Sequence, residues 1–320
     1  MTTFFGRRAN VLVQRAGSAT PISLFAGGDA TGVVPPTGGL MVANVFDGLH
    51  VRFKAEKNYI GQPNTLDLSI YNLAASTRRE LQGQGGFVKL LAGYQSDFPN
   101  LPTIFQGNAR TIDHLRDGPD WVTRIQAGDG ETAYRFGYAS QTFPAGTPLS
   151  QIAIYLAQQL KAGDPLNIDI TAFVNKAPSI AYPTQTFSSG WSVLGNAFEE
   201  LSRLLGSKYT VSIQDGELRA LQSTEYMGGT TTCFKISANT GLIGSPEHGT
   251  PNLSGQPPVL KLHCLLNARI KPGDLVNVDS LNLQGNFRVQ KVTHTGDLAG
   301  NEWFTEIDAT SLAVGNLPFN

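Results

Sequence analysis

Cysteine is nearly absent from the chain, which contains only Cys233 and Cys264 among its 320 residues. Two isolated cysteines provide neither a disulfide framework nor the paired ligand spacing of a zinc site. We therefore expect no metal and no cofactor, and a protein that folds in a reducing cytoplasm.

Long apolar runs are missing as well. No stretch approaches the roughly 18 consecutive apolar residues that a membrane helix requires. The first eight residues, MTTFFGRR, lack the apolar core and the cleavage site of a signal peptide. We expect neither a membrane anchor nor export by a cleaved signal.

Charge is sparse: only 15% of the residues are charged, and the net charge is -1. The basic residues near the N-terminus, Arg7, Arg8 and Arg15, are too few for a nucleic-acid footprint. A polar surface that is poor in ionic groups suits extensive contact with other proteins. The 35 glycines suit many short strands and turns, and the length allows about two domains.

The strongest positive signal is an internal repeat, in which apolar-x-His-x-x-Asp leads into Trp-x-Thr-x-Ile-x-Ala. The first copy consists of Ile112, His114, Asp117, Trp121, Thr123, Ile125 and Ala127, and the second of Val292, His294, Asp297, Trp303, Thr305, Ile307 and Ala309. The period of two predicts a β-hairpin in each copy. The gap before the tryptophan is longer by a pair of residues in the second copy, so a turn absorbs the difference without changing which face each side chain occupies.

The likeness extends upstream, because residues 87–91 precede the first copy and residues 275–278 precede the second, each as an apolar strand followed by a polar loop. We interpret the pattern as a duplicated structural unit. Two related units are too few for a solenoid, but three chains with two units each would supply six quasi-equivalent positions in a ring. The repeat therefore favours a role in assembly over a role in catalysis.

The chain divides by pattern into four parts. We expect an N-terminal arm and linker over residues 1–46, a first β unit over 47–130, an α+β insertion over 131–240 and a second β unit over 241–320. In the first β unit, residues 49–53 and 64–71 alternate as strands do, and residues 74–81 after them predict one short helix.

Within the insertion, Thr147 and Pro148 start a helix that ends near Gly163. Ser189 can cap a second helix, whose broad apolar stripe runs from Trp191 to its end at Gly206. Residues 209–213 and 217–221, joined through an Asp-Gly pair, predict a hairpin.

Candidate catalytic groups are few. The two His-Asp pairs are better explained as repeated turn braces than as catalytic or metal-binding pairs, because a catalytic site is seldom duplicated together with its strands. Cys264 next to His263 invites a cysteine-hydrolase interpretation with His294 as the partner, but a buried thiol is the better explanation. Glu199 and Glu200 lack a matched second acid, so we assign them to the solvent face of a helix.

Two further patterns have ordinary explanations. The glycine-rich residues 83–86 lack the lysine and the helix that a phosphate loop requires, so they predict a turn. Trp121 and Trp303 could be sugar-stacking platforms, but strand tryptophans at repeated positions are expected to pack against the partner layer of the sheet. We assign no catalytic, cofactor-binding or metal-binding residue.

Several segments resemble a known family. Residues 66–73, 88–94 and 104–107 (LDLSIYNL, VKLLAGY and IFQG) look like the opening domain of bacteriophage baseplate hub proteins. Residues 265–274, 285–289 and 294–297 (LLNARIKPGD, GNFRV and HTGD) are similar to the last domain of the same hubs, which are related to phage late control proteins.

The resemblance implies a mainly β fold with an α+β insertion. Two tandem tube-like β-barrel domains per chain would form a pseudo-sixfold ring in a homotrimer, and the ring would join a hexameric tail tube to a trimeric central spike. Its lumen would pass the tape-measure protein and then DNA, and neighbouring baseplate proteins would complete its contacts. The family favours a contractile tail, assembly in the host cytoplasm, a place in the virion baseplate and no enzyme activity.

An alternative is a receptor- or carbohydrate-binding tail protein, in which exposed aromatic residues such as Trp121, Trp303 or Tyr94 would grip a glycan. The duplication separates the two hypotheses, since a receptor-binding protein does not need two tube-like units, whereas a sixfold-to-threefold adaptor does.

Overall fold

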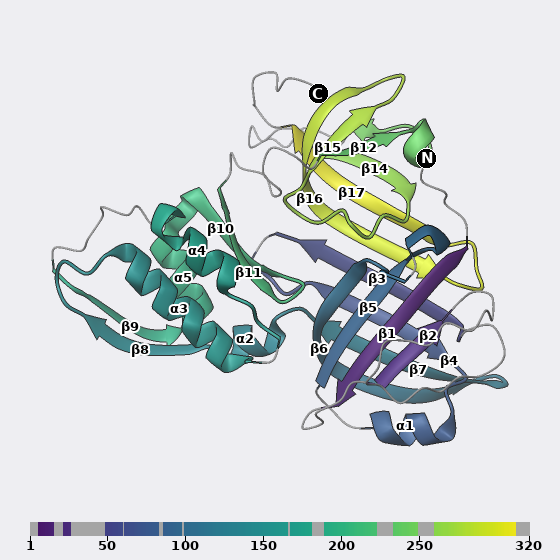
Figure 1. Cartoon of the computed structure of the whole chain (residues 1–320), viewed down its shortest axis with the longest axis horizontal. Helices are drawn as coiled ribbons and strands as arrows, with labels where there is room; N and C mark the ends of the chain where they lie inside the picture. Colours follow the sequence, from purple (N-terminus) through teal and green to yellow (C-terminus); the bar gives the residue numbers. More distant parts are fainter. Residues whose placement is uncertain are drawn as a thin grey trace. The chain divides into compact units, whose positions relative to one another are not determined.

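The computed structural model describes residues 6–15, 22–26, 49–59, 61–82, 86–97, 99–165, 167–180, 189–222, 233–248 and 259–311. By contacts the chain divides into two compact units (Figure 1). The first comprises Met1–Asn58, Thr65–Ala127 and Tyr226–Asn320, and the second comprises Tyr59–Asn64 and Gly128–Glu225. The whole of the segment 27–46, expected as part of the arm and linker, and residues 83–85 of the turn expected at 83–86 lie outside the described residues.

The first unit is one sheet of thirteen strands built from two groups and three additional strands. The first group is β3 (Val51–Asn58), β4 (Thr65–Tyr71), β5 (Gly86–Tyr94), β6 (Thr103–Asp117) and β7 (Asp120–Gly128). The second group is β13 (Glu247–His248), β14 (Val259–Leu265), β15 (Leu275–Asp279), β16 (Gln284–Asp297) and β17 (Trp303–Ser311).

The two groups have the same strand order. Neighbouring strands follow β3-β4-β7-β6-β5 in the first group and β13-β14-β17-β16-β15 in the second. Each strand therefore has a counterpart in the other group at the same place in both the chain and the sheet. The groups are joined because β3 pairs antiparallel with the second half of β16.

Three further strands flank the groups. β1 (Arg7–Arg15) pairs along the whole of β5, and β2 (Ile22–Ala26) pairs with β1. Residues expected in an N-terminal arm thus add two strands to the sheet beside the first group. β12 (Cys233–Ser237) runs parallel to β15 beside the second group.

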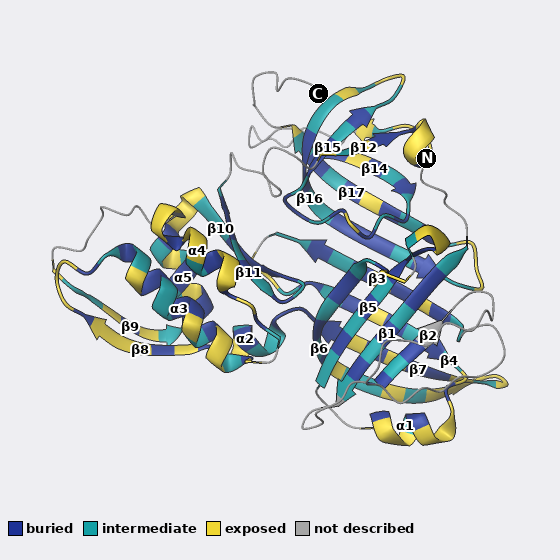
Figure 2. Ribbon diagram, viewed as in Figure 1, coloured by how far each residue is buried: buried dark blue, intermediate teal, exposed yellow. Residues whose placement is uncertain are grey.

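Alternating side chains make the core of this unit, as Figure 2 shows by the alternation of buried and exposed residues along the strands. In β3 the residues Val51, Phe53 and Ala55 are buried, while their neighbours face outward. The pattern is that of a sheet with one covered face, which period-two sequences produce. One short helix, α1 (Ala75–Leu81), follows β4 as the sequence predicts.

The second unit is α+β, as expected for the insertion. Its elements are α2 (Glu131–Phe136), β8 (Tyr138–Phe143), α3 (Leu149–Gly163), α4 (Thr171–Ile180), β9 (Trp191–Asn196), α5 (Ala197–Leu205), β10 (Tyr209–Gln214) and β11 (Glu217–Gln222). The apolar face of α3, from Leu149 to Leu160, packs in a core shared with α5 and β10. No helix among the described residues is long and apolar enough to cross a membrane.

The predicted start of the second helix is wrong. Residues 191–196 form the strand β9, paired with β8, and the helix α5 begins only at Ala197. Asn196, not Ser189, caps it, because the Asn196 side chain accepts hydrogen bonds from the backbone N–H groups of Phe198 and Glu199 at 2.9 and 3.2 Å. The apolar residues from Trp191 onward fit both the period of a helix and that of a strand, so periodicity alone does not locate the change from strand to helix at Ala197.

The predicted hairpin of β10 and β11 is confirmed. Asp215 and Gly216 both have positive φ, 53° and 82°, as the two-residue turn of a hairpin requires. The carboxylate of the fully buried Asp129 accepts hydrogen bonds from the backbone N–H groups of both turn residues, at 2.5 and 2.9 Å. Asp129 thereby holds the turn of this hairpin against the residues at which the chain passes from β7 into the second unit.

Candidate assembly site

The repeated sequence forms two hairpins with the same internal contact. β6 pairs with β7, and β16 pairs with β17. In the first hairpin Nδ1 of His114 is hydrogen-bonded to Oγ1 of Thr123 at 3.0 Å, and in the second Nδ1 of His294 is hydrogen-bonded to Oγ1 of Thr305 at the same distance. Each histidine therefore braces its own hairpin across two strands.

The neighbouring strands repeat the same contacts. The backbone N–H of Asn72 donates to the carbonyl of Trp121 at 2.7 Å, and that of Leu266 donates to the carbonyl of Trp303 at 3.2 Å. These two hydrogen bonds place β4 and β14 at corresponding positions beside the two hairpins. Two further members of the repeat, Ile125 and Ile307, are both buried.

The aspartates of the repeat do not pair with its histidines. Oδ1 of Asp297 lies 2.8 Å from Nε2 of His50, and it also accepts hydrogen bonds from the backbone N–H groups of Ala299 and Gly300. Burial alone would raise the pKa of Asp297, but these hydrogen bonds outweigh it and hold the pKa below its usual value. Asp297 thus orders the second turn, while Asp117 in the first hairpin is exposed.

The two tryptophans differ in their surroundings. Trp303 is 3% exposed and packs edge-on against Phe53 of β3, with ring centroids 5.6 Å apart. Trp121 is 37% exposed, and the guanidinium of Arg78 lies 4.0 Å from its ring centroid. The expectation that both rings pack against the sheet is therefore wrong for Trp121, because no strand of the described chain corresponds there to β3.

Sequence reasoning missed Phe53 and Gly296, which build this junction. A Cβ atom on Gly296 would lie 2.4 Å from the ring of Phe53 and 2.9 Å from that of Trp303. Only glycine lets the two rings meet over the strand. The signal was present in the repeat, since the residue that corresponds to Gly296 in the first copy is Arg116.

The groups considered for hydrolysis lie in a row but are unsuited to it. Thr305 lies opposite Cys264 on one side and opposite His294 on the other. Cys264 donates its thiol to the carbonyl of Thr305 at 3.5 Å, and burial raises its pKa to about 12. A buried, protonated thiol is a poor nucleophile.

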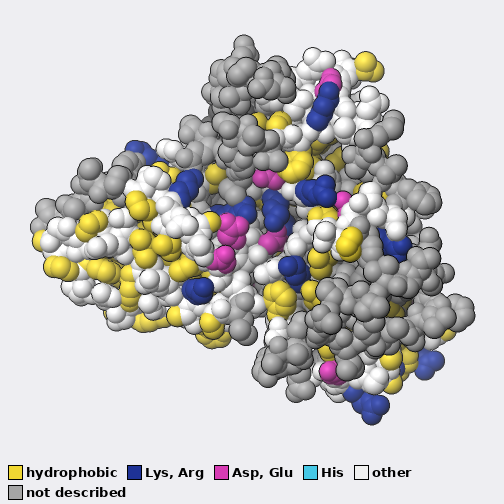
Figure 3. All heavy atoms as spheres, in the orientation of Figure 1, with side chains coloured by type: hydrophobic (Ala, Val, Ile, Leu, Met, Phe, Trp, Pro, Cys, Tyr) yellow, Lys and Arg dark blue, Asp and Glu magenta, His cyan; other side chains and the backbone are white. Residues whose placement is uncertain are grey.

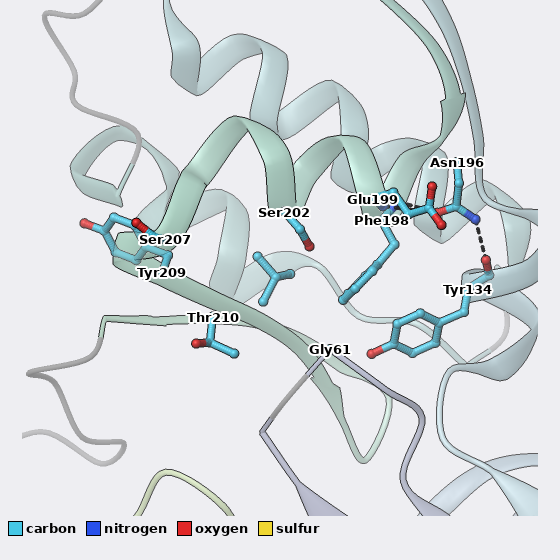
Figure 4. Close-up of a pocket in the computed structure, with 10 residues that line it drawn as sticks. Gly61, Tyr134, Asn196, Phe198, Glu199, Ser202, Ser207, Tyr209 and Thr210 are labelled. Atoms are coloured by element: carbon cyan, nitrogen blue, oxygen red, sulfur yellow. Dashed lines mark hydrogen bonds between the residues drawn. The ribbon is translucent and has the colours of Figure 1, made fainter. Parts of the chain in front are cut away.

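The acidic pair of α5 is divided between two roles. Glu200 forms an ion pair with Arg203 on the same helix, and Glu199 lines an open hollow of about 740 Å³ in the second unit (Figure 4). Aromatic and hydroxyl side chains provide most of its wall, among them Tyr134, Phe198, Ser202 and Tyr209. Among the described residues, no three His, Cys, Asp or Glu side chains are grouped to hold a metal ion.

The described surface is mixed in charge. On the face drawn in Figure 3, basic side chains are scattered, and several of them lie beside acidic ones. Cross-strand ion pairs such as Lys291 with Glu56, at 3.1 Å, account for part of this mixture. Such a surface suits contact with proteins better than binding to a phosphate backbone.

Comparison with known proteins identifies a family. Residues 38–296 match the family model described as "Baseplate hub gp41". No curated protein sequence matches the chain significantly.

Several solved structures share the fold. A tail protein from Neisseria meningitidis MC58 has a TM-score of 0.59 at 8% identity, covering 96% of this chain and 97% of that one. The 43 kDa tail protein of prophage MuSo2 from Shewanella oneidensis gives 0.57 at 9% identity, with 94% and 96% covered. A type VI secretion system component from Escherichia coli gives 0.53 at 11% identity, with 84% and 76% covered. At these identities the likeness concerns the fold.

Proposed function

Because the chain belongs to the baseplate hub gp41 family of bacteriophage tails, we propose that three copies form a closed ring at the centre of the baseplate. The observation that carries the proposal is the identical strand order of the two groups, β3-β4-β7-β6-β5 and β13-β14-β17-β16-β15. Three chains with two alike groups would present six similar positions to a sixfold tube and threefold symmetry to a spike.

The four-part division of the chain belongs to this proposal. The two groups serve as the tandem tube-like domains, each contributing to the wall of a channel. The α+β unit is the insertion of this division, and the strands β1 and β2 widen the first group. The repeated contact of His114 with Thr123 and of His294 with Thr305 supports a common origin for the two groups.

The channel would pass the tape-measure protein and then DNA. A net charge of -1 and a low content of charged residues suit this task, because a strongly basic lumen would retain the phosphate backbone. The partners we propose are the tail tube protein, the central spike and neighbouring baseplate proteins. The tail would be contractile, and assembly would take place in the host cytoplasm.

We propose no enzyme activity for the chain. The buried thiol of Cys264 and the hydrogen-bonded ring of His294 act as structural groups in this interpretation. Purified protein should therefore leave peptidoglycan intact. Clearing of peptidoglycan that is lost in a His294→Ala or Cys264→Ala variant would contradict the proposal.

Electron microscopy of the purified chain at high concentration tests the ring. The proposal predicts end-on views with three chains, six similar lobes and a central hole. A chain that stays monomeric alone and also in a mixture with tube and spike proteins would contradict it.

A second candidate function, binding of a receptor glycan, draws on two observations: Trp121 is partly exposed, and the hollow beside α5 is lined by aromatic and hydroxyl groups. Glycan-array binding that is saturable and lost in Trp121→Ala or Tyr209→Ala would favour this function over the hub.

A further inference from the structure

The junction between the two strand groups shows how one group accepts a strand from the other. Residues 291–297 of β16 pair antiparallel with β3, from Lys291 opposite Asn58 to Asp297 opposite Arg52. Side chains cross this seam, including the edge-on contact of Phe53 with Trp303. The second half of β16 is therefore covered on both edges, by β17 and by β3.

Among the strands that the structure describes, the corresponding stretch of β6 is covered on one edge only. The repeat places residues 111–117 of β6 at the positions of 291–297, since His114 corresponds to His294 and Asp117 to Asp297. In the described part of β5, the pairing with β6 runs as far as Asn108. Among the described strands, β7 alone runs along residues 111–117.

This stretch has the features of an unfilled strand site. Leu115 is 44% exposed and Trp121 is 37% exposed, whereas Trp303 at the equivalent position is covered by β3. Edges with unpaired backbone groups and apolar side chains readily accept a strand from another chain. An occupant equivalent to β3 would complete the site.

The segment equivalent to β3 is residues 241–248. The N–H of Tyr71 donates to the carbonyl of His50 at 2.9 Å, and in the other group the N–H of Leu265 donates to the carbonyl of Gly241 at 2.8 Å. Further along, Glu247 lies opposite Lys261 of β14 as Lys54 lies opposite Asp67 of β4. Residues 241–248 thus run along β14 as β3 runs along β4, at an outer edge of the sheet.

We propose that residues 241–248 of one copy pair antiparallel with residues 111–117 of β6 in the next copy. The contact repeats between chains the seam that β3 and β16 make within the chain, and it deepens the ring proposed above, on which it rests. Because the two surfaces are different, the contact is head-to-tail and can close into a ring.

The side chains indicate how the seam between chains would differ from the internal one. Between Leu242 and Glu247 the segment has two residues more than β3 has between Val51 and Lys54, so it bulges. Ile243, in this bulge, is 39% exposed. Ile243 faces His263 as Arg52 faces Ser69, so residues 244–246 take the place of Phe53 against Trp121, where Arg116 stands in place of Gly296 and leaves less room for a ring.

Disulfide trapping tests the register. In the internal seam Thr295 lies opposite Lys54, and the corresponding pair between chains is Leu115 opposite Glu247. Residues directly opposite in an antiparallel pair have Cα atoms about 4.5–5.5 Å apart, within the range of a disulfide. The variant L115C/E247C, made in a C233S background to remove the exposed native thiol, is oxidised mildly and separated on a non-reducing gel.

The expected result is a ladder of covalent dimers and trimers that ends at the trimer. An equimolar mixture of the single variants L115C and E247C should stop at the dimer, because each chain then carries only one half of the contact. L115C/L281C is the matched control, since Leu281 is a fully exposed side chain far from the segment in sequence. Its crosslinked fraction should be roughly tenfold lower, because its thiols are not held together at high effective concentration.

Three outcomes would overturn the inference in different ways. A particle with the mass of three chains, in which L115C/E247C crosslinks no more than the control, would leave the ring standing and reject this seam. Crosslinking of L115C alone to itself would reject the head-to-tail contact in favour of a symmetric one. A chain that stays monomeric by mass and does not crosslink would reject both the seam and the ring.

Discussion

Phe53 packs edge-on against Trp303, with ring centroids 5.6 Å apart and ring planes 72° apart. The two residues come from different strand groups, so their contact joins the beginning of the first group to the hairpin of the second. Gly296 lies beneath both rings, where a Cβ atom would approach Phe53 to 2.4 Å. The seam between β3 and β16 therefore depends on three residues that no local pattern connects.

Gly296→Ala should destabilise the first unit by about 1–3 kcal/mol, because the added methyl group overpacks the seam and displaces Phe53. Urea denaturation followed by tryptophan fluorescence measures the change. Arg116→Ala at the equivalent position of the first hairpin is the control, and its free energy of unfolding should change by about 0.5 kcal/mol or less. Equal losses in the two variants would contradict the role given to the seam.

Substitution of the two tryptophans of the repeat should have different effects, on folding stability for Trp303 and on assembly for Trp121. Trp303→Ala removes a buried ring and should cost about 3–5 kcal/mol of folding free energy. Trp121→Ala removes a partly exposed ring and should cost about 1 kcal/mol or less, yet it should shift the ring toward monomers at a given concentration.

Thermal unfolding and mass photometry of both variants check this prediction. A Trp121→Ala variant that forms rings as readily as the wild type would indicate that this ring does not lie in a contact between copies. A Trp303→Ala variant as stable as the wild type would contradict the packing described for the seam.

The sequence predicts the parts of the fold that depend on local pattern. Strict alternation locates β3, β4 and the repeated hairpins, and the Asp215-Gly216 pair locates the turn between β10 and β11. Predictions fail where periods compete, as at Trp191, whose neighbours satisfy both a helix and the strand β9.

The seam could not be predicted in the same way. Pairing between β3 and β16 joins residues 52 and 297, and such a distant contact leaves no periodic signal in either strand. The repeat contains an indirect sign, because its two copies differ at the equivalent position that is Gly296 in the second copy and Arg116 in the first. A difference between otherwise alike copies marks the place where their environments differ.

Asp297 should make the first unit sensitive to acid. Its pKa is lowered in the folded state, through hydrogen bonds from His50 and from the turn residues Ala299 and Gly300 that outweigh the effect of burial. A group whose pKa is lower in the folded state contributes stability above its unfolded pKa of about 3.9, and the contribution is lost as the pH falls through the folded pKa. Stability of the wild type should therefore fall below about pH 4 more steeply than that of Asp297→Asn.

The measurement is the free energy of unfolding by urea between neutral and acidic pH. Asn retains an oxygen that can accept the turn hydrogen bonds but has no charge, so the difference between the two proteins isolates the carboxylate. Asp117→Asn, at the exposed equivalent position, is the matched control and should follow the wild type. Parallel curves for the wild type and Asp297→Asn would contradict the assignment.

The two cysteines should differ in their reactivity. Cys264 is buried, and burial raises its pKa to about 12, so almost none of it is thiolate near neutral pH. Cys233 is exposed, and although partial burial also raises its pKa, its thiol is accessible to reagent. Alkylation of the native protein should therefore modify Cys233 alone, and both thiols should react after unfolding.

Peptide mass mapping after treatment with iodoacetamide at mildly alkaline pH measures the two rates separately. Thr305 lies between Cys264 and His294 in the sheet, so the three strands must part before reagent reaches the thiol, and its rate of modification reports opening of the second strand group. Gly296→Ala, which loosens the seam next to this row, should raise that rate while leaving the rate of Cys233 unchanged. Rapid modification of Cys264 in the native wild type would instead support a role for it as a nucleophile, because reactivity requires both access and a lowered pKa.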